Sequence, residues 1–362
     1  MIIGSISENQ NFEKRISLTP EIISKYIKLG FEVQIEKNYG SHLGFKEVSF
    51  THAGAKILNN DEEVIKNSDV IIQLDLPNEK KFSLIKNSAI LIGSFNSLQN
   101  KDVIGKLSSK GVNVFSLDLL PRITRAQSMD ILSSQANLAG YKAVLEAFSF
   151  FEKAIPMMMT AAGTIPAAKV LIVGAGVAGL QAVATAKRMG AIVFATDVRM
   201  ASKEQVESLG GKFLTVEGAE NLETEGGYAK EASDEFKKKQ EELLAETLKK
   251  IDIVICTALI PGKKAPVIIK DNMINNMQSG SVIYDLAAIQ GGNTAYTEVD
   301  KVVDKNGVKI MGERNILNKL PVSSSNLYAK NLFNFVSNLY DNENKKININ
   351  LEDEIIKNTL VK

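Results

Sequence analysis

The segment "KVLIVGAGVAGLQAVATAKRMGAIVFATDVR" (169–199) decides how the rest of this chain is interpreted. An apolar run over 169–173 precedes three glycines, Gly174, Gly176 and Gly179, in the spacing G-x-G-x-x-G. A second apolar run over 191–196 ends at an acid, Asp197. A strand, a glycine turn, a helix, a second strand and a terminal acid, in this order, are typical of a dinucleotide-binding βαβ unit.

Each of these residues has its own predicted role. Gly174 permits the tight turn, Gly176 lets a pyrophosphate approach the first amides of the helix, and Gly179 lets the helix pack closely on the strand. A carboxylate at Asp197 accepts hydrogen bonds from ribose hydroxyls and repels a 2′-phosphate, so NAD(H) is favoured over NADP(H). The alternative is a glycine-rich turn that binds no nucleotide, and the full context disfavours it.

Short apolar runs alternate with amphipathic segments on both sides of this unit. The first series predicts strands at 2–6, 32–36, 69–74, 89–93 and 112–117, with helices at 19–30 and 100–111. The second series predicts strands at 169–173, 191–196, 212–216, 251–256, 281–285 and 307–311. Such alternation predicts parallel sheets with helices on both faces.

The predicted fold class is therefore α/β, with two doubly wound parallel-sheet domains. One domain comprises 1–132 together with 330–362, because the helix expected at 323–341 returns the chain to it. The other comprises 133–329 and is a Rossmann domain. The nucleotide is expected in the cleft between the two domains.

Composition excludes several classes of protein. The chain has 362 residues and a net charge of +1, which gives no basic surplus for binding nucleic acid. Its single cysteine permits no internal disulfide, and neither a signal peptide nor a membrane span is expected. The most apolar stretch, 154–180, is interrupted by Pro156, Pro166 and Lys169, so a loop followed by a buried strand is the better interpretation. No metal ligands are assigned.

The polar run "PRITRAQSMD" (121–130) stands directly before a helix rich in small residues. The chain has only two histidines, His42 and His52, and neither is marked as a general base. Hydride exchange between two nicotinamide rings needs no acid or base, only two rings held face to face with water excluded. The scarcity of bases is mild support for that reaction, although a lysine base remains an alternative.

Several motifs together resemble a known family. They are "GAGVAGLQAVATAKRMGA", "TDVR", "SKEQVESLGGKF", "GGYAKE", "TALIPGKKAPVI" and "RAQSMDILSSQANLAGYKAV". The chain resembles the NAD(H)-binding component, or alpha subunit, of proton-translocating NAD(P) transhydrogenase. The resemblance runs from "EKRISLTPE" (13–21) to "LEDEIIKNTL" (351–360).

The resemblance implies roles for individual residues. Arg122, Gln127, Asp130 and Ser133 would hold the nicotinamide end, and Tyr228 would be the contact residue of a mobile loop. From the sequence alone, 217–240 is equally a solvated surface loop. The implied cofactor-binding set is Gly174, Ala175, Gly176, Val177, Gly179, Asp197, Val198, Arg199, Thr257, Ala258, Leu259, Asp285 and Leu286.

The resemblance also implies partners. NADP(H) would be bound by a partner subunit, and proton movement would occur in membrane-spanning partner subunits. The chain would form a homodimer on the cytoplasmic face of the inner membrane, held there by its partners. Because the sequence carries no spanning segment and ends at Lys362, a separate-subunit organisation or a truncated chain is expected.

Two alternatives remain. One is a soluble amino-acid dehydrogenase similar to alanine dehydrogenase, which shares the resemblance at Arg15, a substrate-binding arginine in that family. The lysine and histidine of that family are replaced here by Asp75 and Asn96, so Arg15 is expected to be structural and paired with an acid. The other alternative is a regulatory module that senses NAD. Arg125 has no assigned role and is expected to be a solvated charge.

Overall fold

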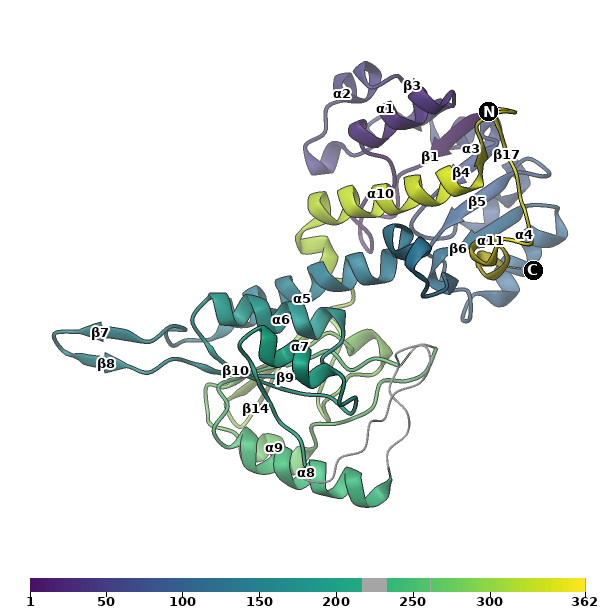
Figure 1. Cartoon of the computed structure of the whole chain (residues 1–362). Coiled ribbons are helices and arrows are strands. Elements are labelled where there is room, and N and C mark those ends of the chain that lie inside the picture. Colours follow the sequence, from purple (N-terminus) through teal and green to yellow (C-terminus); the bar gives the residue numbers. More distant parts are fainter. Residues whose placement is uncertain (217–232, 261, 362) are drawn as a thin grey trace. The chain divides into compact units, whose positions relative to one another are not determined.

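The computed structural model describes residues 1–216, 233–260 and 262–361. The chain forms two compact units, and the boundary between them lies inside α5 (Ile131–Phe150). Unit 1 consists of Met1–Gln135 and Leu317–Lys362, and unit 2 of Ala136–Ile316 (Figure 1). Each unit is built on a seven-stranded sheet, which confirms the predicted α/β class.

The sheet of unit 1 has the order β18-β6-β5-β4-β1-β2-β3. Its pairings are parallel except at β18, which runs antiparallel to β6. The strands are β1 (Ile2–Ser5), β2 (Glu32–Glu36), β3 (Ala55–Leu58), β4 (Val70–Ile72), β5 (Ile90–Gly93), β6 (Asn113–Ser116) and β18 (Leu360–Val361). The C-terminal segment thus completes the sheet that the N-terminal segment begins.

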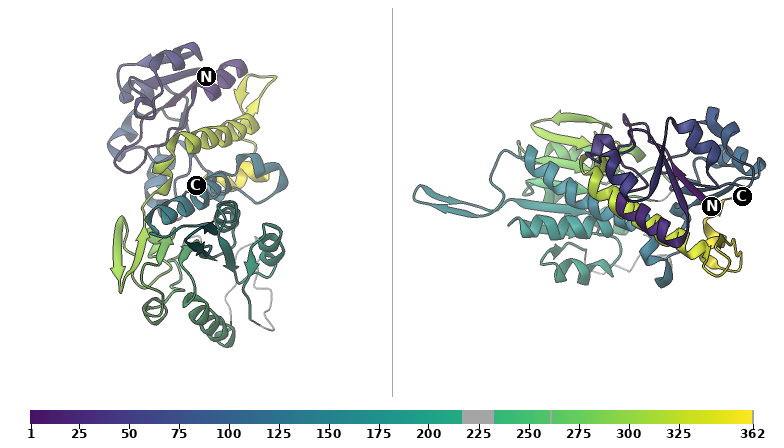
Figure 2. Two further views of the ribbon diagram at one scale, coloured as in Figure 1. Left: turned by 90° about the vertical axis from the view of Figure 1, so that its left-hand side faces the viewer. Right: turned by 90° about the horizontal axis from the view of Figure 1, so that it is seen from above.

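Helices cover both faces of this sheet because its strands are apolar on both sides. In β4, Val70 and Ile72 enter one core together with side chains of α1 and α10, while Ile71 enters a second core with side chains of α3 and α4. Figure 2 shows α1 and α10 side by side in unit 1. The helices are α1 (Pro20–Leu29), α2 (Glu47–His52), α3 (Asp61–Asn67), α4 (Lys101–Ser109), α10 (Pro321–Leu339) and α11 (Glu354–Thr359).

The sheet of unit 2 has the order β11-β10-β9-β12-β13-β15-β14. Chain order reverses between β9 and β12, so this is the switch point of a doubly wound sheet. Only the edge pairing of β14 with β15 is antiparallel. The strands are β9 (Lys169–Val173), β10 (Ile192–Thr196), β11 (Lys212–Phe213), β12 (Ile253–Cys256), β13 (Val282–Asp285), β14 (Lys301–Lys305) and β15 (Val308–Gly312).

The helices of unit 2 follow the strands as the βαβ pattern requires. Helix α6 (Val177–Arg188) begins directly after the glycine turn, and α7 (Ser202–Ser208) lies between β10 and β11. Helices α8 (Asp234–Leu248) and α9 (Asp271–Asn275) cover one face with Leu244, Leu248 and Met273. None of the helices within the described ranges has the length and apolar character needed to cross a membrane.

A two-stranded hairpin in unit 2 was not predicted. Strands β7 (Met158–Thr160) and β8 (Gly163–Ile165) pair antiparallel where the sequence indicated only a loop. Every residue of both strands is exposed, and the hairpin projects from the rest of unit 2 (Figure 1). Its apolar residues follow no buried-face pattern, so the alternation that identifies strands is absent here. A second short pair is formed by β16 (Tyr340–Asp341) and β17 (Lys346–Ile347) in unit 1.

Candidate functional site

The glycine turn between β9 and α6 has the geometry that its motif predicts. Gly174 adopts φ +93°, a left-handed conformation that favours glycine. A Cβ on Gly179 would lie 1.8 Å from the carbonyl oxygen of Gly174, so no larger residue fits there without displacing α6. A Cβ on Gly176 would meet only Arg199 Nη2, at 3.7 Å. The space above Gly176, at the positive end of α6, is therefore open to an anion.

Asp197 lies at the end of β10, beside this turn. Its Oδ2 accepts from the backbone amide of Ala175 at 2.7 Å and from Arg199 Nη2 at 2.7 Å. Its Oδ1 accepts from the amide and Nε of Arg199, at 2.8 and 2.9 Å. The carboxylate thus fixes the glycine turn and also holds an arginine near the proposed pyrophosphate position. A ribose hydroxyl would have to share these oxygens.

The segments that follow β12 and β13 border the same edge of the sheet. Thr257 Oγ1 donates to the carbonyl oxygen of Gly174 at 2.8 Å, which joins the segment after β12 to the glycine turn. Leu259 is exposed there, whereas Ala258 and Leu286 are half-buried. The predicted cofactor-binding residues of unit 2 therefore gather at the carboxyl ends of β9, β10, β12 and β13.

Asp285, at the end of β13, is completely buried. Its carboxylate accepts from the amides of Ala287 and Asn293, at 2.8 and 2.6 Å, and from Thr297 Oγ1 at 2.5 Å. Burial raises the pKa of this carboxyl, and the hydrogen bonds from Thr297 and the backbone oppose the rise. Its oxygens are thus occupied within the chain, and Asn293, which sequence reasoning missed, connects it to its surroundings.

The predicted nicotinamide-holding residues lie in unit 1, on η4 (Thr124–Met129) and its flanks. Arg122 and Gln127 are exposed, and Asp130 and Ser133 are half-buried. Asp130 accepts from the amide of Ser133 at 2.9 Å and from its hydroxyl at 2.6 Å, so it caps the first turn of α5. The structure brings Asp130 and Ser133 together by this contact. Tyr228 lies outside the described residues.

Arg125 is not the solvated charge that was expected. Its Nη1 and Nη2 donate to both carboxylate oxygens of Asp353, at 2.8 and 2.5 Å. This bidentate bond lowers the pKa of Asp353 to about 2. Asp353 is also the N-cap of α11, so Arg125 ties the polar run to the C-terminal helix. The expectation was wrong because the two residues are 228 positions apart in sequence.

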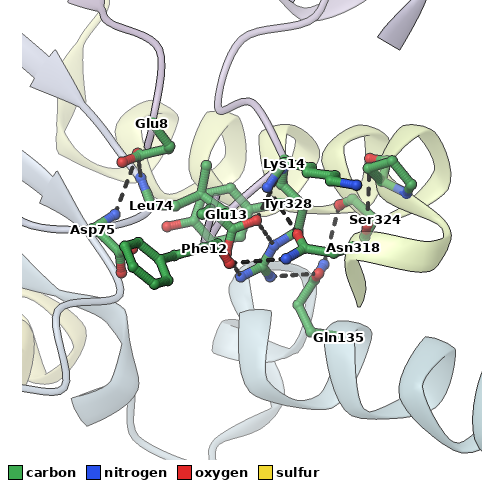
Figure 3. Close-up of polar contacts among 12 residues, drawn as sticks. Glu8, Phe12, Glu13, Lys14, Leu74, Asp75, Gln135, Asn318, Ser324 and Tyr328 are labelled. Atoms are coloured by element: carbon green, nitrogen blue, oxygen red, sulfur yellow. Dashed lines mark hydrogen bonds and ion pairs between the residues drawn. The ribbon is translucent and has the colours of Figure 1, made fainter. Parts of the chain in front are cut away.

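Arg15 is paired with an acid, as the sequence predicted. Its Nε and Nη2 donate to the two carboxylate oxygens of Glu13, at 2.8 and 2.6 Å, and its Nη1 donates to Gln135 Oε1 at 2.9 Å. The ring of Tyr328 lies against the guanidinium, with 5.8 Å between Cζ and the ring centroid. Figure 3 shows this cluster, in which Glu13 and Gln135 converge from different elements. The guanidinium therefore spends its planar hydrogen-bonding edges on this chain's own side chains.

A second carboxylate stands in the same region. Glu8 Oε1 accepts from the amide of Leu74 at 2.8 Å, from Gln73 Nε2 at 3.0 Å and from the amide of Asp75 at 3.3 Å (Figure 3). Enclosure of this carboxyl and the nearby charge of Asp75 raise its pKa to about 8. An acid, not a lysine, therefore stands next to Arg15's cluster, and sequence reasoning did not single out Glu8.

Comparisons with known proteins agree with this architecture. The family model "Alanine dehydrogenase/PNT, N-terminal domain" matches residues 4–139, and "Alanine dehydrogenase/PNT, C-terminal domain" matches 143–362. The chain is 47% identical, over its full length, to an NAD(P) transhydrogenase alpha subunit of Rhodospirillum rubrum and covers 96% of that protein. It is 45% identical to an NAD(P) transhydrogenase alpha subunit of Rickettsia prowazekii, of which it covers 94%.

Solved structures give the same result. A transhydrogenase from Sinorhizobium meliloti superposes with a TM-score of 0.90 at 42% identity, with 99% of this chain and 98% of that chain covered. An L-alanine dehydrogenase shares the fold, with a TM-score of 0.81 at 20% identity, and 99% and 94% coverage. The fold and the glycine turn define a nicotinamide-nucleotide-binding protein of two α/β units. The chain belongs to the alanine dehydrogenase/PNT family, and its similarity places it with the alpha subunits of NAD(P) transhydrogenase.

Proposed function

We propose that this chain is the NAD(H)-binding subunit of a proton-translocating NAD(P) transhydrogenase. It would transfer hydride directly between its own NAD(H) and an NADP(H) that a partner subunit holds. The observation that carries the proposal is the carboxyl edge of the unit 2 sheet, where an open glycine turn, a helix N-terminus and Asp197 converge. The transhydrogenase alpha subunits are its most informative relatives for the reaction.

The residues present in unit 2 fit a dinucleotide. Open space above Gly176 would accept the pyrophosphate, and the first amides of α6 would bind its oxygens. Asp197 would accept from the adenosine ribose and repel a 2′-phosphate, which favours NAD(H) over NADP(H). Ala175, Val177, Val198, Thr257 and Leu259 would line the site. NADH supplies the hydride, and this chain's residues bind and orient it.

The nicotinamide end would be held by the unit 1 residues that the resemblance identified. Arg122 and Gln127 would bond the carboxamide or reach towards the second nucleotide, and both are exposed. Asp130 and Ser133 would fix the orientation of the ring, since their own hydrogen bond already orders them. Tyr228 would close over the site. Binding and exclusion of water would lower the barrier, because hydride exchange between two nicotinamides requires no proton transfer.

The chemistry of unit 1 argues against an amino-acid dehydrogenase. A substrate carboxylate would need the planar edges of the Arg15 guanidinium, and these already bind Glu13 and Gln135. The neighbouring acids, Glu8 and Asp75, would repel such a substrate further.

The partners follow from the proposed reaction. An NADP(H)-binding subunit and membrane-spanning subunits would complete the enzyme and place this chain on the cytoplasmic face of the membrane. We also propose a homodimer, supported by the β7–β8 hairpin. A two-stranded hairpin alone is marginal in water, and this one exposes Met157, Met159 and Ile165. Met159→Glu should lower the dimer fraction in analytical ultracentrifugation, with the exposed Val302→Glu as the matched control.

One assay tests the function. The purified chain is given NADH with a recombinant NADP(H)-binding partner, and separately NADH with pyruvate and ammonia. Hydride transfer only with the partner supports the proposal, and turnover of pyruvate by the chain alone would defeat it. Absence of transfer with a competent partner would favour a regulatory NAD-binding module. Asp130→Asn and Arg122→Ala should slow transfer in a folded protein, and parental rates in both would refute these assignments.

A further inference from the structure

Asn293 is a completely buried asparagine in the segment that follows β13. Its Oδ1 accepts from the amide of Ala258 at 3.0 Å. Its Nδ2 donates to the carbonyl oxygens of Ala258 and Pro266, at 2.8 and 2.9 Å. All three side-chain bonds therefore go to the backbone of the segment that follows β12.

The backbone of Asn293 is fixed in turn by Asp285. Asp285 Oδ2 accepts from the Asn293 amide at 2.6 Å, and Thr297 Oγ1 donates to the same oxygen at 2.5 Å. Asp285 is fully buried, with its carboxylate occupied inside the chain. Its influence on the site therefore passes through Asn293.

The position of this relay in the sheet gives it a functional meaning. Strands β9 and β12 are neighbours at the switch point, and in doubly wound sheets the segments after these strands border the nucleotide crevice. Thr257 Oγ1 joins the segment after β12 to Gly174. The half of the sheet formed by β12, β13 and β15 is the half that takes the second mononucleotide of a dinucleotide.

We propose that Asn293, held by Asp285, is a positioning residue that shapes the wall for the nicotinamide half of the dinucleotide. This inference rests on the proposed function of NAD(H) binding. Without the Asn293 side chain, the amide and carbonyl of Ala258 and the carbonyl of Pro266 lose their partners. The segment then has to shift to recover hydrogen bonds, because buried backbone groups are costly to leave unpaired.

The test compares two ligands on the full chain. Calorimetry measures the dissociation constants of NADH and of 5′-AMP, which carries only the adenosine half. Asn293→Ala should raise the dissociation constant of NADH roughly tenfold and leave that of 5′-AMP within about twofold. Thr297→Val removes one bond to Asp285 and should give a smaller loss of the same kind. It serves where Asn293→Ala does not fold.

Ser281→Ala is the matched control, since Ser281 makes a buried hydrogen bond to Ile251 at the amino end of β13. It should leave both dissociation constants unchanged. Parental NADH binding in folded Asn293→Ala and Thr297→Val would overturn the inference, and so would an equal loss of both ligands, which indicates general loosening of unit 2. Failure of the parental chain to bind NADH would instead overturn the proposed function.

Discussion

Two regions of this chain have the same sheet architecture and opposite chemistry at their polar centres. In unit 2, the glycine turn offers backbone amides and open space above Gly176. In unit 1, the polar cluster around Arg15 is closed by side chains that bind one another, with Glu13 and Gln135 on the guanidinium. The first region remains available to a ligand, whereas the second has become a component of the fold. The comparison shows that a retained arginine does not by itself retain a substrate site.

The largest effect is expected from closing the open region. Gly179→Ala places a methyl group 1.8 Å from the carbonyl oxygen of Gly174, so α6 must move away from the turn. NADH binding, measured by calorimetry, should be lost. Gly105→Ala on α4 is the control, because nothing lies within 4 Å of its Cβ position. It should bind NADH normally and gain about 0.5–1 kcal/mol of stability. Normal NADH affinity in Gly179→Ala would refute the site.

The next effect concerns the closed region. Arg15→Met leaves Glu13, only 5% exposed, without its cation. Removing one partner of a buried ion pair costs about 3–5 kcal/mol, whereas removing both costs much less. The free energy of unfolding in urea should therefore fall more in Arg15→Met than in the double variant Glu13→Gln/Arg15→Met. NADH affinity should not change in either. A substrate-binding Arg15 would instead tolerate replacement without loss of stability.

The pH dependence of stability sharpens the comparison further. The pKa of Glu8 is raised to about 8, above the ordinary value of about 4.3 in the unfolded chain. Between these values the folded state holds a proton that the unfolded state has released, so the free energy of unfolding falls as the pH rises through the window. The slope cannot exceed about 1.4 kcal/mol per pH unit.

Glu8→Gln should remove this slope, measured by urea unfolding between pH 5 and pH 8 as roughly chosen limits of that window. Glu62→Gln, at an exposed position of α3, is the control and should retain it. An unchanged slope in Glu8→Gln would show that the carboxyl is ionised throughout, as its three hydrogen-bond donors alone would favour.

The smallest effect is expected where the polar run meets the C-terminal helix. Asp353→Ala removes an N-cap and should cost about 1 kcal/mol. Because the pKa of Asp353 is lowered to about 2, its contribution is present above about pH 4 and is lost as the pH falls towards 2. Acid titration of the melting temperature should show a smaller loss in Asp353→Ala than in the parent. Equal acid sensitivity would mean that the Arg125 bridge adds nothing.

Most of the fold could be predicted from the sequence. The strands of both sheets and the glycine turn follow from local periodicity, since an apolar run, a turn residue and a helix period are properties of neighbouring residues. The hairpin β7–β8 could not be predicted, because its strands bury no face. The nicotinamide-holding residues, including Tyr228, came from resemblance and not from pattern, and they stay predictions.

The sequence by itself determined the βαβ unit, the α/β class and the kind of nucleotide site, because each depends on residues close together in the chain. Only the tertiary structure decided which polar groups neutralise one another. Arg15 meets Gln135 across 120 residues, and Arg125 meets Asp353 across 228. Asn293 reaches Ala258 across 35. Such pairings are set by the order of strands and helices in space, and no local pattern encodes them.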